Sequence, residues 1–137
     1  MVLVDTPIWS LALRRRTVDL SPLDRRLTQG LYELAQQGRV RLMGPVRQEI
    51  LSGIREEQQF RRIRDYLRDF PDVELDSLDY EEAARISNAC RRGGVVGSPV
   101  DMIMCSVSLR HHWEIFTTDR DFTHYRRVIP LRLFPAR

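Results

Sequence analysis

The sequence predicts an α/β fold, a three-layer sandwich in which a mostly parallel central sheet is flanked by helices. Short apolar runs typical of buried strands alternate with longer segments of helical periodicity, which favours parallel strands joined by crossover helices. Several helical segments begin with the same signature, a capping residue followed by proline. No repeat or low-complexity linker interrupts the 137 residues, so we expect one domain over residues 1–137.

The first strand and the first helix are expected at the N-terminus. Residues 1–4 are apolar throughout, as in a central strand, and this run stops at Asp5. Thr6 and Pro7 then form a capping signature for a helix over residues 8–13. Asp5 would thus lie at the carboxyl end of a strand, where ligands bind in open α/β sheets. The structural alternative is that Asp5 helps to cap this helix.

The middle of the chain continues the alternation. Ser21 and Pro22 open a helix that ends near Gly38, and its leucines form a stripe for the core or for a dimer surface, made of Leu23, Leu27, Leu31 and Leu34. Residues 39–43 alternate like a half-exposed strand, and a short helix over 46–52 follows. Four further elements are expected: a charged helix over 55–70, a strand over 73–75, a helix capped by Ser77 or Asp79 that continues to Cys90, and a strand over 131–134.

The most informative stretch follows a glycine-rich loop. Ser98 and Pro99 predict the start of an apolar helix buried on most of its circumference, and Asp101 lies in its first turn. Residues 114–117 then indicate a buried strand that ends in an acidic turn over 118–121. Ser98 and Asp101 also have the spacing of a capping box, so a purely structural role for Asp101 is the alternative.

Five acids from distant segments are expected to meet at one edge of the sheet, namely Asp5, Glu49, Asp101, Asp119 and Asp121. Taken alone, Glu49 would be an ordinary surface glutamate, but like Asp5 it follows a strand. Closely packed carboxylates raise one another's pKa unless a cation neutralises them. Oxygen ligands without a histidine or cysteine cluster select Mg²⁺ or Mn²⁺ over zinc, and such an ion supports phosphodiester hydrolysis. We therefore predict a divalent-metal-dependent nuclease with these catalytic acids.

The charge composition suits a nucleic acid partner. The chain has 22 basic residues, all of them arginine, against 19 acids, and a net charge of +3. Arginine donates two hydrogen bonds at once to phosphate, although a biased nucleotide composition would also explain the missing lysine. Without a membrane-span-length apolar run or a signal peptide, the protein is expected in the cytoplasm, with Cys90 and Cys105 as reduced thiols.

The order of these features resembles the PIN-domain ribonucleases, and in length the VapC toxins of bacterial toxin–antitoxin pairs. The resemblance rests on an N-terminal strand that ends in Asp5-Thr6, a mid-chain Glu49 in a short helix, Asp101 at the start of an apolar helix, and the final motif TTDRDF. Pro7 departs from the family pattern, which commonly has a small polar residue there.

The resemblance implies roles for individual residues. Asp5, Glu49 and Asp101 match the first three acids of the family's site, while the fourth is Asp119 or Asp121. Asp119 is favoured, so the expected metal ligands are Asp5, Asp101 and Asp119, with Asp121 as an alternative or supporting ligand. Thr6 and Thr118 match hydroxyls that hold the metal's water or the carboxylates. From its place between two acids, Arg120 is expected to contact the scissile phosphate or to pair with one of them.

By resemblance, the protein is an Mg²⁺- or Mn²⁺-dependent endoribonuclease that inhibits translation. Its partners would be an RNA substrate, a cognate antitoxin whose tail occupies the active-site groove, and a second copy in a homodimer. Two alternatives belong to other classes. A phosphoacceptor receiver domain is disfavoured because it relies on a lysine. A catalytically inactive PIN-like module that binds RNA or a partner remains open, and so does the identity of the RNA.

Overall fold

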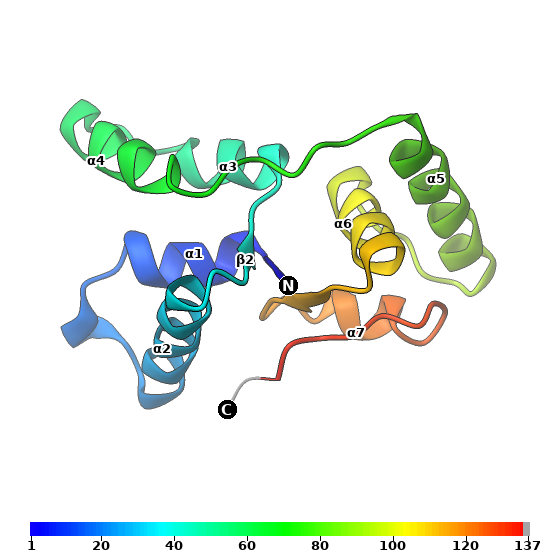
Figure 1. Ribbon diagram of the computed structural model, residues 1–137. Helices are drawn as coiled ribbons and strands as arrows, with labels where there is room; N and C mark the ends of the chain where they lie inside the picture. The colour runs from blue at the N-terminus through cyan, green and yellow to red at the C-terminus, as the bar shows by residue number, and fades with distance from the viewer. Residues whose placement is uncertain (136–137) are drawn as a thin grey trace.

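A parallel sheet of three short strands lies at the centre of the computed structural model, which describes residues 1–135 (Figure 1). In space the strands follow the order β2-β1-β3, with bounds Val40–Arg41, Val2–Val4 and Glu114–Phe116. In the register of the central strand, Val2 lies opposite Val40 on one side and Glu114 on the other. All three residues of β1 are at most 1% exposed, as expected of a strand covered on both faces.

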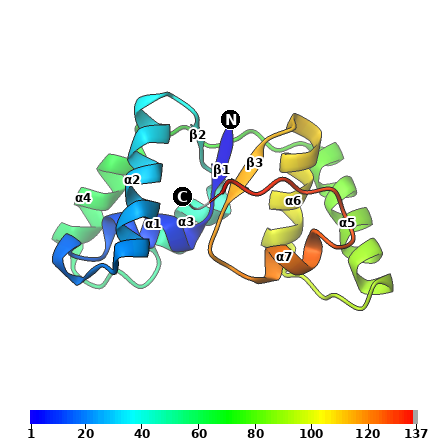
Figure 2. The same ribbon diagram turned by 90° about the horizontal axis from the view of Figure 1, so that it is seen from below.

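Helices flank the sheet on both sides. In the described part of the chain they are α1 (Thr6–Leu13), α2 (Pro22–Gln36), α3 (Gly44–Leu51), α4 (Glu57–Leu67), α5 (Ser77–Arg92), α6 (Pro99–His111) and α7 (Asp121–Tyr125), with a 3-10 turn, η1, over Thr17–Asp19. Figure 2 shows α1 to α4 on one side of the strands and α5 to α7 on the other. The predicted three-layer α/β class is therefore confirmed, while the last two residues of the predicted domain lie outside the described part.

Two helices begin where the sequence predicts. The Ser21 hydroxyl accepts the backbone N–H of Asp24 at 3.1 Å, and the Ser98 hydroxyl accepts that of Asp101 at the same distance. In both helices proline follows the capping serine, where a missing N–H has no cost.

Two other helices begin one residue or more before the predicted cap. The N-cap of α1 is Asp5, whose carboxylate accepts the N–H of Thr6 at 2.8 Å. The N-cap of α5 is Asp76 rather than Ser77 or Asp79. Asp76 and Asp79 accept each other's backbone N–H, and this reciprocal capping box satisfies two amide groups at once.

The strands expected over 73–75 and 131–134 were wrong as regular strands. The structure has single parallel bridges instead, between Asp72 and Leu42 and between Leu133 and Ile115. Prolines stand beside both segments, at positions 71, 130 and 135. Proline cannot donate a hydrogen bond to a ladder, so pairing at the two sheet edges remains short.

The core lies between the sheet and the helices. Trp9 is fully buried, and its indole N–H donates to the Val4 carbonyl at 3.1 Å, which fixes α1 against the end of β1. Leu23 is 49% exposed and so does not belong to the core, unlike the other three leucines of the α2 stripe. Cys90 and Cys105 are buried free thiols, as expected. Among residues 1–135, no helix combines the length and apolarity needed to span a membrane.

Candidate active site

The carboxyl ends of β1 and β3 bring two polar segments to one edge of the sheet. Val4 pairs with Phe116 in the last register position, so Asp5 and Thr117 are the next residues on neighbouring strands. The Asp5 N–H donates to the Phe116 carbonyl at 2.9 Å, which continues the ladder. The Thr117 hydroxyl donates to Asp5 Oδ2 at 2.7 Å. A single side-chain contact thus joins segments that are 112 residues apart.

Local hydrogen bonds shape the turn that follows β3. The Asp119 N–H donates to Thr117 Oγ1 at 3.0 Å, and the Asp121 N–H donates to Asp119 Oδ1 at 2.9 Å. The Thr117 hydroxyl therefore donates to Asp5 and accepts from the Asp119 backbone. This network fixes the start of α7 next to the end of β3.

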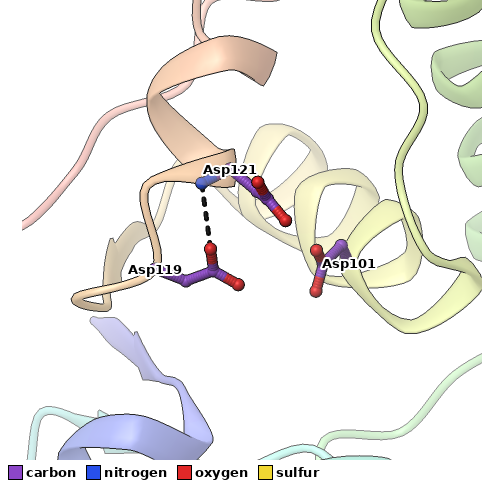
Figure 3. Close-up of side chains that lie close together, drawn as sticks. All are labelled: Asp101, Asp119 and Asp121. Carbon is purple, nitrogen blue, oxygen red and sulfur yellow. Dashed lines mark hydrogen bonds between the residues drawn. The ribbon is translucent and has the colours of Figure 1, made fainter.

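The first turn of α6 supplies a third acid to the same place. Ser98 caps this helix, and the Asp101 carboxylate makes a different contact: its Oδ2 accepts the Tyr125 hydroxyl at 2.7 Å. Figure 3 shows the carboxyl groups of Asp101, Asp119 and Asp121 gathered between α6 and the turn before α7. One oxygen from each of these acids lies within 4.8 Å of the others.

Burial and neighbouring charges change the titration of two site acids. The pKa of Asp5 is raised to about 6, mainly by burial and to a smaller extent by the charges of Asp101 and Asp119, while the hydrogen bonds from Thr117 and Thr6 act to lower it. Burial also raises the pKa of Asp101, with smaller contributions from Asp119 and Asp121. A bound cation would remove this penalty.

Glu49 lies beside Asp5 rather than in the acid group. It is exposed on α3, and its Oε2 accepts the Thr6 hydroxyl at 3.1 Å. Because the Thr6 N–H also donates to Asp5, Thr6 links the two acids from the start of α1.

Thr118 and Arg120 make no side-chain contact with the site acids in the described part of the chain. Both are exposed, and within residues 1–135 neither side chain forms a hydrogen bond. In the same range Arg120 forms no ion pair with Asp119 or Asp121. Its guanidinium is therefore open to a ligand.

Two residues that contact the acids were missed in the sequence. Thr117 was assigned to the strand alone, although aligning the ends of parallel β1 and β3 places it level with Asp5. Tyr125 lies between the predicted acidic turn and the predicted last strand, where no element is expected. The i, i+3 spacing of Phe122 and Tyr125 after Asp121 was the signal for a short helix with one buried face.

The donor set suits a hard divalent cation. Oxygens that share one Mg²⁺ at about 2.1 Å lie at most about 4.2 Å apart, close to the spacing of the three carboxylates. Neither histidine nor cysteine belongs to the group, which disfavours zinc. Asp5 lies outside these three acids, yet close enough for two of them to raise its pKa.

The chain is similar to known proteins over nearly its whole length. The family model of the PIN domain matches residues 2–128. Ribonuclease VapC11 of Mycobacterium tuberculosis is 28% identical over 135 residues, which cover 96% of each chain.

Two solved structures have the same fold. FitAcB from Neisseria gonorrhoeae superposes with a TM-score of 0.77 at 17% identity, over 99% of this chain and 98% of the other. A toxin–antitoxin complex from Klebsiella pneumoniae gives a TM-score of 0.69 at 20% identity, over 89% and 90% of the two chains. These structures confirm the fold that the resemblance implies. Because the family model matches nearly the whole sequence, the chain belongs to the PIN domain family.

Proposed function

We propose that the protein is a divalent-metal-dependent endoribonuclease and the toxin of a toxin–antitoxin pair. The observation that carries the proposal is the gathering of Asp101, Asp119 and Asp121 beside the buried Asp5, at the carboxyl edge of a parallel sheet. Membership of the PIN domain family supports it, and so does the similarity to a protein named ribonuclease VapC11.

In this proposal the carboxylates of Asp101, Asp119 and Asp121 hold Mg²⁺ or Mn²⁺, and Asp5 completes the acidic site. When bound, the ion polarises a phosphodiester oxygen and lowers the pKa of water. Both candidates for the fourth acid then have a role, because Asp119 and Asp121 both offer oxygens to the group. Glu49 is linked to Asp5 through Thr6, which donates its hydroxyl to Glu49 and its backbone N–H to Asp5.

The remaining residues act on the substrate. The Arg120 guanidinium binds a phosphate next to the scissile bond, since its side chain has no partner within residues 1–135 and stands between two of the site acids. Thr118, exposed beside it, is free to donate to the RNA backbone. Other exposed arginines bind further phosphates, which orders the RNA across the carboxyl edge of the sheet.

The partners follow from the same comparisons. One structural neighbour is a toxin–antitoxin complex, so we propose a cognate antitoxin that covers the acidic site, and a homodimer as the assembled form. Cleavage of RNA in the cytoplasm would then inhibit translation once the antitoxin is lost.

Cleavage of total RNA by the purified, antitoxin-free protein tests the proposal. We expect discrete fragments with Mg²⁺ or Mn²⁺, no fragments with chelator, and at least about 100-fold less cleavage by Asp101→Asn, which loses a ligand charge. Asp24→Asn is a matched control, because Asp24 occupies the same position after a capping serine and a proline in α2. It should cleave like the wild type.

The outcome that contradicts the proposal is equally specific. RNA that binds to well-folded protein but stays intact with either metal would assign the chain to the binding modules. Equal cleavage by Asp101→Asn and the wild type would separate the activity from the acid group.

A further inference from the structure

We propose that Tyr125 is a positioning residue for Asp101, and that Gly97 gives it the room to act. The inference rests on the proposed function, because it concerns how one ligand of that metal site is held. Tyr125 does not touch the other site acids through any hydrogen bond within residues 1–135, so its effect passes through Asp101 alone.

The tyrosine hydroxyl is fixed in place by its surroundings. Tyr125 is 1% exposed at the end of α7, and its ring packs edge-on against the fully buried Phe122, with 5.2 Å between the ring centroids. The hydroxyl donates to Asp101 Oδ2 at 2.7 Å. Because the ring has no freedom to move, this hydrogen bond restricts the rotation of the Asp101 carboxyl group.

Such a restraint matters most before the metal binds. The carboxylates of Asp101, Asp119 and Asp121 repel one another when they are charged, and an unrestrained side chain in the first turn of α6 would turn away from the others. The Tyr125 hydroxyl opposes that movement. It keeps an Asp101 oxygen within 4.8 Å of the other two acids, so less reorganisation is needed on metal binding.

Gly97 explains how the tyrosine reaches α6. A Cβ atom at this position would lie 3.1 Å from Tyr125 Cε1 and would overlap with the end of the Met102 side chain, which is 2% exposed. Gly97 directly precedes the capping Ser98. Glycine at this position therefore favours the close approach of the start of α6 to the ring, since a larger residue would shift the ring and the Met102 side chain.

The same short helix carries both parts of the device. α7 begins at Asp121, one of the three acids, and ends at Tyr125, which holds another. The geometry of the site thus depends on the packing of α7 against α6, and not only on the turn after β3.

A titration of the metal-free protein with Mn²⁺ tests the role of Tyr125. The loss of the electron paramagnetic resonance signal of free Mn²⁺ measures how much of the ion is bound. We expect Tyr125→Phe, which removes only the hydroxyl, to bind Mn²⁺ about tenfold more weakly, as for other outer-shell partners of metal ligands. A loss of folding stability in this variant does not affect the measurement, because the affinity is measured on folded protein. In RNA cleavage, saturating Mn²⁺ should restore most of the wild-type rate.

Two further variants complete the design. Tyr66→Phe is the control, since Tyr66 is half-buried and packs against Phe70, as Tyr125 packs against Phe122, but its hydroxyl makes no hydrogen bond within residues 1–135. It should bind Mn²⁺ like the wild type. Gly97→Ala keeps the Tyr125 hydroxyl but displaces the ring, and should also weaken Mn²⁺ binding.

The outcomes separate this inference from the proposed function. Loss of Mn²⁺ binding in Asp101→Asn together with wild-type affinity in Tyr125→Phe would overturn the role of Tyr125 and leave the metal site intact. Wild-type protein that binds no Mn²⁺ would overturn both. Weaker binding by Tyr125→Phe, with Tyr66→Phe unchanged, supports the positioning role.

Discussion

Asp5 is the most buried of the site acids, at 7% exposure, and burial raises its pKa from 3.8 to about 6. In the unfolded chain the same group titrates near pH 3.9. Below about pH 4 Asp5 is protonated in both the folded and the unfolded chain, so its titration does not change the free energy of unfolding. As the pH rises, the unfolded state loses this proton first, so folding becomes less favourable until the native group has also ionised above about pH 6. The full penalty is about 3 kcal/mol.

For the metal-free protein we therefore expect Asp5→Asn to be more stable than the wild type at pH 7.5. The gain should be about 2 kcal/mol, because the amide loses about 1 kcal/mol of hydrogen bonding with Thr6 or Thr117. Near pH 4 most of the titration penalty is absent, so the lost hydrogen bonding should leave Asp5→Asn slightly less stable than the wild type. Urea unfolding with chelator at the two pH values measures this, and a variant less stable at pH 7.5 would contradict the burial argument.

The acids of the site could be predicted from the sequence, but their polar neighbours could not. Asp5 and Asp119 stand directly after strand-like runs, and this position is a local signal. The choice between Thr117 and Thr118 depends on how β3 aligns with β1, which only the register decides. The contact of Tyr125 with Asp101 depends on the packing of two helices, which no local pattern encodes.

Among the helices, α3 and α4 are joined by one arginine. The Arg47 Nε donates to the Asp72 carboxylate at 2.7 Å, and the guanidinium also donates to the carbonyls of Leu67, at 2.9 Å, and Phe70. Leu67 is the last residue of α4, where helix carbonyls lack partners within the helix. Arg47 thus closes α4 and holds it against the helix that carries Glu49.

We expect Arg47→Met, which keeps the apolar stem, to lower the free energy of unfolding by about 2–3 kcal/mol, because the carbonyls of Leu67 and Phe70 lose a charged donor. Arg61→Met is the control, since the pair of Arg61 with Glu57 is exposed and contributes at most about 0.5 kcal/mol. Urea unfolding compares the two. Equal losses of unfolding free energy in the two variants would show that the Arg47 contacts stabilise the protein no more than an exposed ion pair does.

Elements differed in how well the sequence predicted them, for a physical reason. The start of a helix depends on side chains within a few residues, as at Ser21 and Ser98, so it can be recognised locally. Strand pairing depends on residues far away along the chain. The segments after Asp72 and around Leu133 have strand-like composition, yet each pairs at one position only.

For the whole molecule, the relevant property is charge. The net charge is +3, and several of the 19 acids belong to the site, so the 22 arginines give the remaining surface a larger positive excess. A surface of this kind binds RNA through phosphates and releases counterions.

We therefore expect RNA binding by the Asp101→Asn variant to weaken about twentyfold between 50 and 200 mM salt, as for about three phosphate contacts with a single strand. Fluorescence anisotropy with a labelled RNA measures the affinity without cleavage. An affinity independent of salt would contradict binding through the arginines.

Because β1 pairs with β3, the central strand cannot be paired on that side until the end of the chain has been synthesised. Residues 2–4 are synthesised first, but their neighbours at 114–116 follow only after more than a hundred further residues, about 5–20 s later at usual rates of synthesis. Until then Asp5 has neither the Thr117 hydroxyl nor the acids of the turn beside it. A nascent chain therefore carries the first acid of the site long before it has a site.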